Sequence, residues 1–408
     1  MILLIYNLLL YLLLPVIVLI VVTKSRKGEL SARLWGTVPD SSQSIWIHCA
    51  SVGEVNAVKP LIVKLRELYT DLPIVISTMT ITGRETAQNI HSELSAFILP
   101  LDYPHLMRNT FKKLNPRLLI IIETELWPNM LSLAGKKNIP VVIINGRMSE
   151  KSHNDFEKSM FLWRRPFKAI RMVGAQTRQD ADYYSSLGIC PAHYTGNLKF
   201  ALNLPEWDIN ELRSKYGYTP DDFICVFGST RPGEELLLIK TICQLNLEMD
   251  IKTVIVPRHL ERLEEIVTHF REAGFNPALT SRKETGKLLI VDEMGILTSF
   301  YALADICLIG GSFTNFGGHN PLESAFYGKP ILIGPHHHSC RHSVEQLKIN
   351  NAIHIVEGSE LPKAIRFLYH HPEERQEMGM NARQTLIEHA DSLDKNLELL
   401  KSFLRIRR

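Results

Sequence analysis

Short apolar runs alternate with longer stretches of helical spacing along most of the chain. In the first half, the runs typical of buried strands are 44–50, 74–77, 96–99, 118–122, 141–145 and 172–175. The stretches between them with helical spacing or composition are 55–69, 82–91, 105–114, 126–137 and 179–187. This alternation predicts a doubly wound parallel sheet.

The same pattern restarts after a polar segment, 201–222. The strand-like runs of the second series are 224–227, 253–256, 288–291, 306–309 and 331–333, with helical stretches at 233–247, 260–272 and 296–304 and three more after the last strand. We therefore predict an α/β protein of two Rossmann-like domains facing a cleft, spanning 24–205 and 206–408. The last helix is a candidate to pack back on the first domain. Ligands of such sheets bind beyond the carboxyl ends of the strands.

Residues 1–23 form a different kind of segment. From Ile2 to Val22 no residue is charged, and a helix of this length spans about 30 Å, the thickness of a bilayer core. We predict a membrane anchor, with the basic residues from Lys24 onward placing the rest of the chain in the cytoplasm. A signal peptide fits less well, because the run is long and lacks a basic start and a cleavage site. A helix lying in the membrane interface stays open.

Length and composition narrow the remaining choices. A chain of 408 residues fits two domains of ordinary size, and 45% hydrophobic with 22% charged residues is typical of a globular protein. A net charge of +3 gives no reason to expect a nucleic acid. The six cysteines have no CxxC spacing, which favours reduced thiols in a cytosolic environment.

The most informative stretch is Gly310 to Glu323, GGSFTNFGGHNPLE, between an apolar run and a helical pattern. Its glycines let the backbone approach a ligand closely, and a helix start suits an anionic group such as phosphate. The carboxylate of Glu323 suits the hydroxyls of a sugar. A plain loop joining a strand to a helix is the alternative interpretation, but the ordered His-Asn-Pro-Glu favours a nucleotide-ligand site.

In the first domain, carboxylates follow two strand-like runs. Glu54 in ASVGE lies at a strand-to-helix turn, where it suits a general base, although capping of the helix is the commoner role of such a residue. Glu123 and Glu125 in IETELWP supply too few oxygen ligands for a divalent ion, so one is expected to start the next helix and the other to face the cleft. Lys199 in GNLKF suits an anionic leaving group, or is simply solvated.

In the second domain, polar or glycine-containing loops again follow the strand-like runs. They are GSTRPGEE at 228–235, VPRH at 256–259 and DEMGI at 292–296. Arg258 suits a phosphate or a base edge. A further tract, His336 to His338 with Cys340 and His342, is weak evidence for a metal, because consecutive histidines cannot all face one ion. A loop lining the cleft or a solvated tract is the preferred interpretation.

With these motifs in view, the chain resembles the Kdo transferase family, which attaches 3-deoxy-D-manno-oct-2-ulosonic acid (Kdo) to the lipid A precursor of Gram-negative bacteria. The resemblance rests on the N-terminal apolar stretch followed in order by HCASVGEV, STMTITG, IIETELWPN, INGRMS, GNLKF, GSTRPGEE, VPRH, DEMGIL, GGSFTNFGGHNPLE and IGPH. It implies a GT-B glycosyltransferase at the cytoplasmic face of the inner membrane. The donor implied is CMP-Kdo, held by the second domain, and the first domain receives the lipid.

The resemblance also assigns roles to individual residues. The general base falls on Glu54, with Glu123 and Lys199 as transition-state stabilising sites. The implied contacts to CMP are Pro257, Arg258, Met294, Gly295, Ile296, Asn320, Pro321, Leu322 and Glu323. One departure is Arg231, where many members have a histidine, so its contact to donor or acceptor is open.

The mechanism expected from these roles is inverting. Glu54 takes a proton from the acceptor hydroxyl, and the CMP phosphate is stabilised at the helix start, with Arg258 adding positive charge and Lys199 as a second candidate. We predict no cofactor and no metal, because protein donors can stabilise a single phosphate. The alternative enzyme is another GT-B transferase that uses a UDP-sugar on a membrane lipid. A non-catalytic sugar- or nucleotide-binding module has no use for a carboxylate at Glu54.

Overall fold

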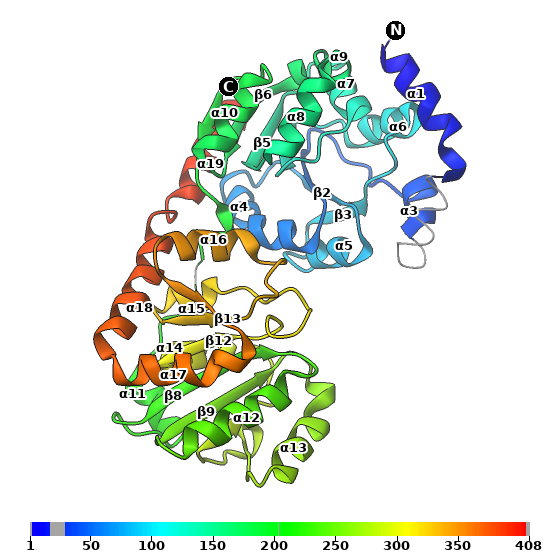
Figure 1. Cartoon of the computed structure of the whole chain (residues 1–408). Helices are drawn as coiled ribbons and strands as arrows, with labels where there is room; N and C mark the ends of the chain where they lie inside the picture. Colours follow the sequence, from blue (N-terminus) through cyan, green and yellow to red (C-terminus); the bar gives the residue numbers. More distant parts are fainter. Residues whose placement is uncertain (1, 17–28, 203, 405–408) are drawn as a thin grey trace. The chain divides into compact units, whose positions relative to one another are not determined.

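A computed structural model describes residues 2–16, 29–202 and 204–404. The chain divides into two compact units, Met1–Ala201 together with Asp391–Arg408 and, between them in sequence, Leu202–Ala390. Each unit has a parallel sheet of its own (Figure 1). The prediction of two Rossmann-like, parallel-sheet domains is confirmed.

The sheet of unit 1 has the strand order β3-β2-β1-β4-β5-β6-β7. Its strands are β1 (Ile45–Cys49), β2 (Ile74–Thr78), β3 (Ser95–Ile98), β4 (Leu118–Ile122), β5 (Val141–Gly146), β6 (Ile170–Ala175) and β7 (Ala192–Tyr194). Its helices are α1 (Ile2–Leu12), α3 (Glu29–Trp35), α4 (Val52–Leu68), α5 (Ile81–Gln88), α6 (Pro104–Leu114), α7 (Pro128–Lys136), α8 (Glu150–Lys158), α9 (Met160–Trp163), η1 (Pro166–Ala169), α10 (Arg178–Ser186), η2 (Leu198–Phe200) and α19 (Ser392–Leu404).

Alternate residues of these strands enter different cores. On β1, Ile45 and Ile47 pack with α4 and α19, whereas Trp46 packs on the other face with side chains of α6 and α7. The period of two therefore buries both faces of the sheet, which is why its strands read as continuous apolar runs. Burying one such aliphatic side chain contributes about 1.5–3 kcal/mol.

Unit 2 has a sheet of the order β10-β11-β9-β8-β12-β13-β14. Its strands are β8 (Phe223–Thr230), β9 (Ile251–Pro257), β10 (Ala278–Leu279), β11 (Leu288–Ile290), β12 (Ile306–Ile309), β13 (Ile331–Ile333) and β14 (Ile353–Ile355). Its helices are α11 (Ile209–Lys215), α12 (Glu234–Asn246), η3 (Leu260–Arg262), α13 (Leu263–Glu272), η4 (Thr280–Arg282), α14 (Leu297–Leu303), α15 (Leu322–Phe326), α16 (Arg341–Ile349), η5 (Gly358–Glu360), α17 (Leu361–His370) and α18 (Pro372–Ile387). Side chains of α12, α13 and α17 cover one face of this sheet.

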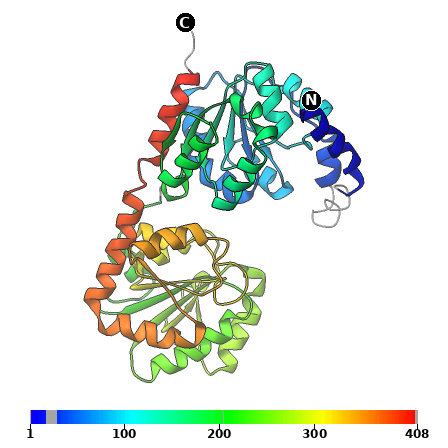
Figure 2. The same ribbon diagram turned by 45° about the horizontal axis from the view of Figure 1, so that its top comes forward.

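The last helix belongs to unit 1, although unit 2 precedes it in sequence. α19 packs against α4, β5 and β6, and Leu397, Leu400 and Leu404 enter the unit 1 core. Gly174 of β6 lets the helix approach, since a Cβ there would lie 2.5 Å from Oδ1 of Asn396. Figure 2 shows this helix in red beside the elements of unit 1.

The described part of the N-terminal segment contains the helix α1, Ile2–Leu12. Among the described residues no helix is long and apolar enough to cross a membrane, and residues 17–23 of the predicted anchor lie outside them. α1 is joined to the rest of unit 1 by hydrogen bonds: Tyr6 Oη donates to Asp102 Oδ2 at 3.3 Å and Asn129 Nδ2 donates to Asn7 Oδ1 at 2.7 Å. Asp102 in turn accepts the first free N–H groups of α7.

Candidate active site

Glu54 lies in the first turn of α4, directly after β1. Ser51 is the N-cap of this helix, and its side chain accepts from the Glu54 N–H. The Glu54 carboxylate accepts from the Ala50 N–H at 2.7 Å and from Ser51 Oγ at 3.2 Å. The expected capping interactions are therefore present, and the role of Glu54 as a general base stays a prediction.

Burial changes the chemistry of this carboxyl group. Glu54 is 9% exposed, and burial raises its pKa to about 7, assisted by the nearby negative charges of Glu123 and Glu125 and opposed by the hydrogen bond from Ala50. A helix N-terminus favours the charged form, but here desolvation has the larger effect. A carboxylate with a pKa near neutrality is a much stronger base than an ordinary glutamate.

Glu123 follows β4 with a strained backbone. Its φ is 57°, in the left-handed region that residues other than glycine rarely adopt. Tyr184 Oη donates to its carbonyl oxygen at 3.1 Å, and its side chain pairs with Lys199 Nζ at 3.2 Å. Strain of this kind costs about 1–3 kcal/mol and is common at functional sites.

A buried polar network fixes the backbone that carries Lys199. Asn197 Oδ1 accepts from the Lys199 N–H, and Asn145 Oδ1 accepts from the Leu198 N–H at 2.9 Å. Gln176 links the two asparagines by hydrogen bonds to both. Unit 1 therefore brings together all three residues to which the resemblance gives catalytic roles, and those roles stay predictions.

The prediction that one of the two glutamates, Glu123 or Glu125, starts the next helix is wrong. Neither glutamate starts the next helix, because α7 begins at Pro128, whose fixed φ suits the first helical position. Burial raises the pKa of Glu125, and the Arg33 guanidinium nearby opposes this rise. Arg33 of α3 donates from Nη2 to the Met79 carbonyl at 2.6 Å. No motif pointed to it, since a single arginine in a helix carries no signal.

In unit 2, the predicted contacts to CMP lie on neighbouring strand ends and helices. Arg258 follows β9, and its N–H donates to the Thr230 carbonyl at the end of β8. Burial raises the pKa of Glu323 in α15, and the Arg258 charge opposes that rise. Met294, Gly295 and Ile296 lead into α14, which packs against α15. The structure therefore places these segments on adjacent elements.

The helix predicted at Leu322 is short, which changes its expected role. α15 spans five residues, its N-cap position is Pro321, and Asn320 Oδ1 accepts from the Leu322 N–H at 3.2 Å. Its first turn is thus partly capped by its own chain, and so short a helix has a small dipole. Stabilisation of a phosphate by this helix start is not supported, which leaves the cationic side chains nearby as the stronger candidates.

A buried glutamate holds the glycine-rich loop in place. Glu234, 1% exposed, accepts from the N–H groups of Arg231, Gly311 and Phe313 at 2.8, 2.8 and 3.0 Å. It thereby ties the loop after β8 to the loop after β12. The motif GSTRPGEE contained this residue, but the contact spans 77 positions and no local pattern predicts it.

The histidine-rich tract covers the same loop. His336 N–H donates to the Ser312 carbonyl at 3.0 Å and Ser339 N–H donates to the Gly317 carbonyl at 2.8 Å. A Cβ on Gly317 would lie 2.1 Å from Ser339 Oγ, so this glycine is needed for the close approach. Within the described part of the chain, no group of three or more His, Cys, Asp or Glu residues could hold a metal ion.

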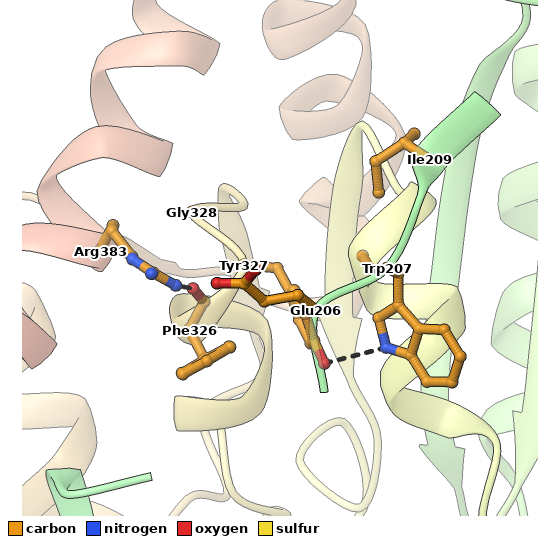
Figure 3. Close-up of a pocket in the computed structure, with 8 residues that line it drawn as sticks. Glu206, Trp207, Ile209, Phe326, Tyr327, Gly328 and Arg383 are labelled. Carbon is orange, nitrogen blue, oxygen red and sulfur yellow. Dashed lines mark hydrogen bonds between the residues drawn. The ribbon is translucent and has the colours of Figure 1, made fainter. Parts of the chain in front are cut away.

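Two cavities lie away from the predicted contacts. One, of about 350 Å³, is at the other end of α15 and is lined by Trp207, Tyr327 and Arg383 among others; Figure 3 shows Trp207 Nε1 donating to Tyr327 Oη at 3.1 Å. The second, of about 1130 Å³, borders α1 in unit 1. Its basic lining residues are Arg108, Lys136, Arg164, Arg165, Lys168 and Arg171.

Comparison with known proteins identifies the family. The model of the family described as 3-deoxy-D-manno-octulosonic-acid transferase matches residues 24–202. A bifunctional glycosyltransferase/methyltransferase of Fusobacterium nucleatum is 34% identical over 71% of this chain, and the chain covers 47% of that protein. The 3-deoxy-D-manno-octulosonic acid transferase of Haemophilus influenzae is 30% identical over 89% of this chain and 87% of its own length.

The fold agrees with this match. A glycosyltransferase structure from Rickettsia africae aligns over 89% of this chain and 99% of its own at 14% identity, with a TM-score of 0.54. At this identity the likeness shows the fold alone, which is that of the GT-B glycosyltransferases. The protein is therefore a glycosyltransferase, and it belongs to the 3-deoxy-D-manno-octulosonic acid transferase family.

Proposed function

We propose that this protein is an inverting glycosyltransferase that moves Kdo from CMP-Kdo to the lipid A precursor in lipopolysaccharide core biosynthesis. The choice of sugar rests on the family relatives. The proposed chemistry rests on one observation, the buried Glu54 carboxyl group whose pKa is raised to about 7 beside the Glu123–Lys199 pair. Such a group is half ionised near neutral pH, the condition that suits a general base.

Each unit supplies one half of the reaction. In unit 1, Glu54 accepts the proton of a hydroxyl on the acceptor glucosamine disaccharide, and the hydroxyl oxygen forms a bond to the anomeric carbon of Kdo. The bond between that carbon and the phosphate oxygen breaks, and CMP leaves from the opposite face with the electron pair. The configuration at the anomeric carbon inverts, and the proton stays on Glu54 until it passes to solvent.

This reaction scheme gives a role to the charged side chains of each unit. Lys199, held by the asparagine network, offers an ammonium group toward developing negative charge, and Glu123 orients it. In unit 2, Arg258 is the candidate partner of the CMP phosphate, and Glu323 is the candidate acceptor of the ribose hydroxyls. The remaining candidate contacts to CMP, 294–296 and 320–322, follow the same assignment.

The test compares wild type with Glu54→Gln, using CMP-Kdo, the tetraacylated lipid A precursor and mass spectrometry of the products. We expect a loss of turnover of about 10²–10⁴-fold with unchanged binding of CMP, measured by calorimetry. Glu67→Gln, an exposed position on α4, is the matched control. Near-normal transfer by Glu54→Gln would remove it as the base. Transfer from a UDP-sugar in place of CMP-Kdo would establish the alternative donor.

We also propose that α1 holds the enzyme on the cytoplasmic face of the bacterial inner membrane by lying in the interface. One side of the helix binds the rest of unit 1, while its other side is exposed and apolar: Leu4, Ile5, Leu8, Leu9 and Leu12 are each at least half exposed, as are Leu13 and Val16 after the helix. The basic residues around the neighbouring cavity are all exposed as well. Apolar burial combined with attraction to anionic lipids is how interfacial helices bind.

Vesicle flotation tests this proposal. Leu8→Asp with Leu12→Asp should release the protein from vesicles that contain anionic lipid, since both leucines lie in one row of the exposed side. Leu247→Asp is the matched control, because Leu247 is 85% exposed in unit 2. Retention of the double variant on the vesicles would count against α1 as the anchor.

A further inference from the structure

Arg231 presents a fixed guanidinium group beside the glycine-rich loop of unit 2. Its Nε donates to His319 Nε2 at 3.2 Å, and its Nη1 lies 2.5 Å from His259 Nε2. His259 Nδ1 lies 3.1 Å from Glu261 Oε1, so the proton of this imidazole is on Nδ1 and its Nε2 accepts. The guanidinium also stacks on the Phe316 ring, 5.3 Å from the ring centroid.

The positive charge of Arg231 is oriented but not neutralised. Among the residues that the structure describes, no carboxylate forms an ion pair with its guanidinium, and both of its side-chain partners are imidazoles. The pKa of His319 is lowered to about 4 by burial and then by the charges of Arg231 and Arg258, so His319 is a neutral acceptor at neutral pH. An arginine has five N–H donors in a planar fork. The two N–H donors of Nη2, at least, are left to bind a ligand.

The backbone under this side chain is rigid. Glu234 accepts from the Arg231 N–H and from the Gly311 N–H through the same oxygen. At Gly311, with φ of 71°, a Cβ would lie 3.2 Å from His319 Nε2 and 3.4 Å from Arg231 Cγ. Thr230, directly before Arg231 and 2% exposed, has a buried hydroxyl without a hydrogen-bond partner. A polar group left unpaired in this way is costly unless a ligand satisfies it.

A second arginine, Arg258, follows the end of the neighbouring strand β9. The Arg258 N–H donates to the Thr230 carbonyl at 3.1 Å, so the two arginines follow backbone segments that are bonded to each other, and both charges act on His319. Two adjacent cations suit a ligand with two adjacent anions. In CMP-Kdo the anomeric carbon bears both the phosphate ester and a carboxylate, which are separated by only a few bonds.

We propose that the Arg231 guanidinium, held by His259 and His319, binds the carboxylate of the donor sugar, while Arg258 binds the phosphate. This inference rests on the proposed function, because it takes CMP-Kdo as the donor. Arg231 thereby determines specificity: a planar fork pairs with a carboxylate through two parallel hydrogen bonds, and a donor sugar without a carboxylate leaves the guanidinium unpaired.

The test measures binding of CMP, CMP-Kdo and the C1 carboxamide of CMP-Kdo to the full-length protein, and transfer to the lipid A precursor. Arg231→Met should weaken CMP-Kdo binding roughly 10- to 150-fold, the range for hydrogen bonds between charged groups. Binding of CMP should change less than about twofold. Wild type should prefer CMP-Kdo to the carboxamide by a similar factor, and Arg231→Met should lose this preference. Arg282→Met, an exposed position in unit 2, is the matched control.

The outcomes separate this inference from the function beneath it. If wild type transfers Kdo and Arg231→Met keeps the preference for the carboxylate, the carboxylate site is overturned and the function stands. If Arg231→Met weakens CMP and CMP-Kdo equally, Arg231 binds the phosphate and the inference is again overturned. If wild type neither transfers Kdo nor binds CMP-Kdo more tightly than CMP, both proposals fail.

Discussion

The raised pKa of Glu54 predicts a pH dependence that an ordinary glutamate cannot give. The perturbation is a change of pH from 6 to 8 at saturating lipid acceptor, with the donor concentration varied. Because the general base must be ionised, kcat/KM should rise through an apparent pKa near 7, the value that burial gives this carboxyl group.

The magnitude follows from the shift. With a pKa of about 7 in place of 4.5, about a tenth of the enzyme carries the ionised base at pH 6 and about nine-tenths at pH 8, so kcat/KM should increase about tenfold. A glutamate with its ordinary pKa would be ionised throughout this range and would give a flat profile.

Stability should change in the opposite direction. The folded-state pKa is raised above the unfolded value, so folding favours the protonated carboxyl group, and the free energy of unfolding falls as pH rises from about 4.5 to 7. The shift corresponds to about 3 kcal/mol at most. Glu54→Gln removes this titration, so its free energy of unfolding should not fall in this way. Measured by urea unfolding, the stability of the variant relative to wild type should therefore increase as pH rises.

The assay is initial-rate transfer of Kdo across the pH series, with Glu67→Gln as the control for a surface glutamate. Phosphates of the substrates titrate in the same range, so the residual rate of Glu54→Gln is measured as well and should be independent of pH. A limb near pH 7 that survives in Glu54→Gln, or a flat profile in wild type, would refute the assignment of Glu54 as the base.

Three further predictions concern a second candidate catalytic residue, the glycine-rich loop and the attachment of α1. Lys199→Met should lower kcat about 10²–10³-fold. The free energy of unfolding in urea should fall by less than about 1 kcal/mol, because the ion pair of Lys199 is partly exposed. A normal kcat would exclude Lys199 from stabilising the transition state. Gly310→Ala places a Cβ 2.4 Å from a backbone carbonyl oxygen and should abolish donor binding in calorimetry, whereas Gly286→Ala, with 3.6 Å to its nearest neighbour, should bind normally. Tyr6→Phe removes the hydrogen bond to Asp102, worth about 1 kcal/mol, and should make α1 several-fold more sensitive to limited proteolysis; an unchanged cleavage rate would show that other contacts hold the helix.

The central strands could be predicted because their apolar runs are continuous. A strand such as β4, buried on both faces, has no polar position to interrupt the pattern. The edge strands β7, β10 and β14 were missed: β7 and β14 have three residues each, of which two are exposed, and β10 has only two residues. Strands this short carry no apolar run to detect.

The candidate site was predictable only where it follows from topology. Parallel strands place their carboxyl ends at one edge, which is how Glu54 and Glu123 could be expected near each other. The residues that hold the site are different: Glu234 reaches its loop across 77 positions, and Arg33 enters from a helix without a motif. For α1, the signal was present, since Tyr6 and Asn7 interrupt the apolar stretch on the side that binds unit 1.

The position of α19 has a consequence for biosynthesis of the chain. Ser392–Leu404 supplies Leu397, Leu400 and Leu404 to the core of unit 1, yet the ribosome makes this segment only after the whole of unit 2. The core of unit 1 therefore stays incomplete, with an apolar groove unfilled, until unit 2 and then α19 have been synthesised. A nascent chain arrested before residue 391 should present this groove to chaperones, and a separately added peptide of the α19 sequence should compete for it.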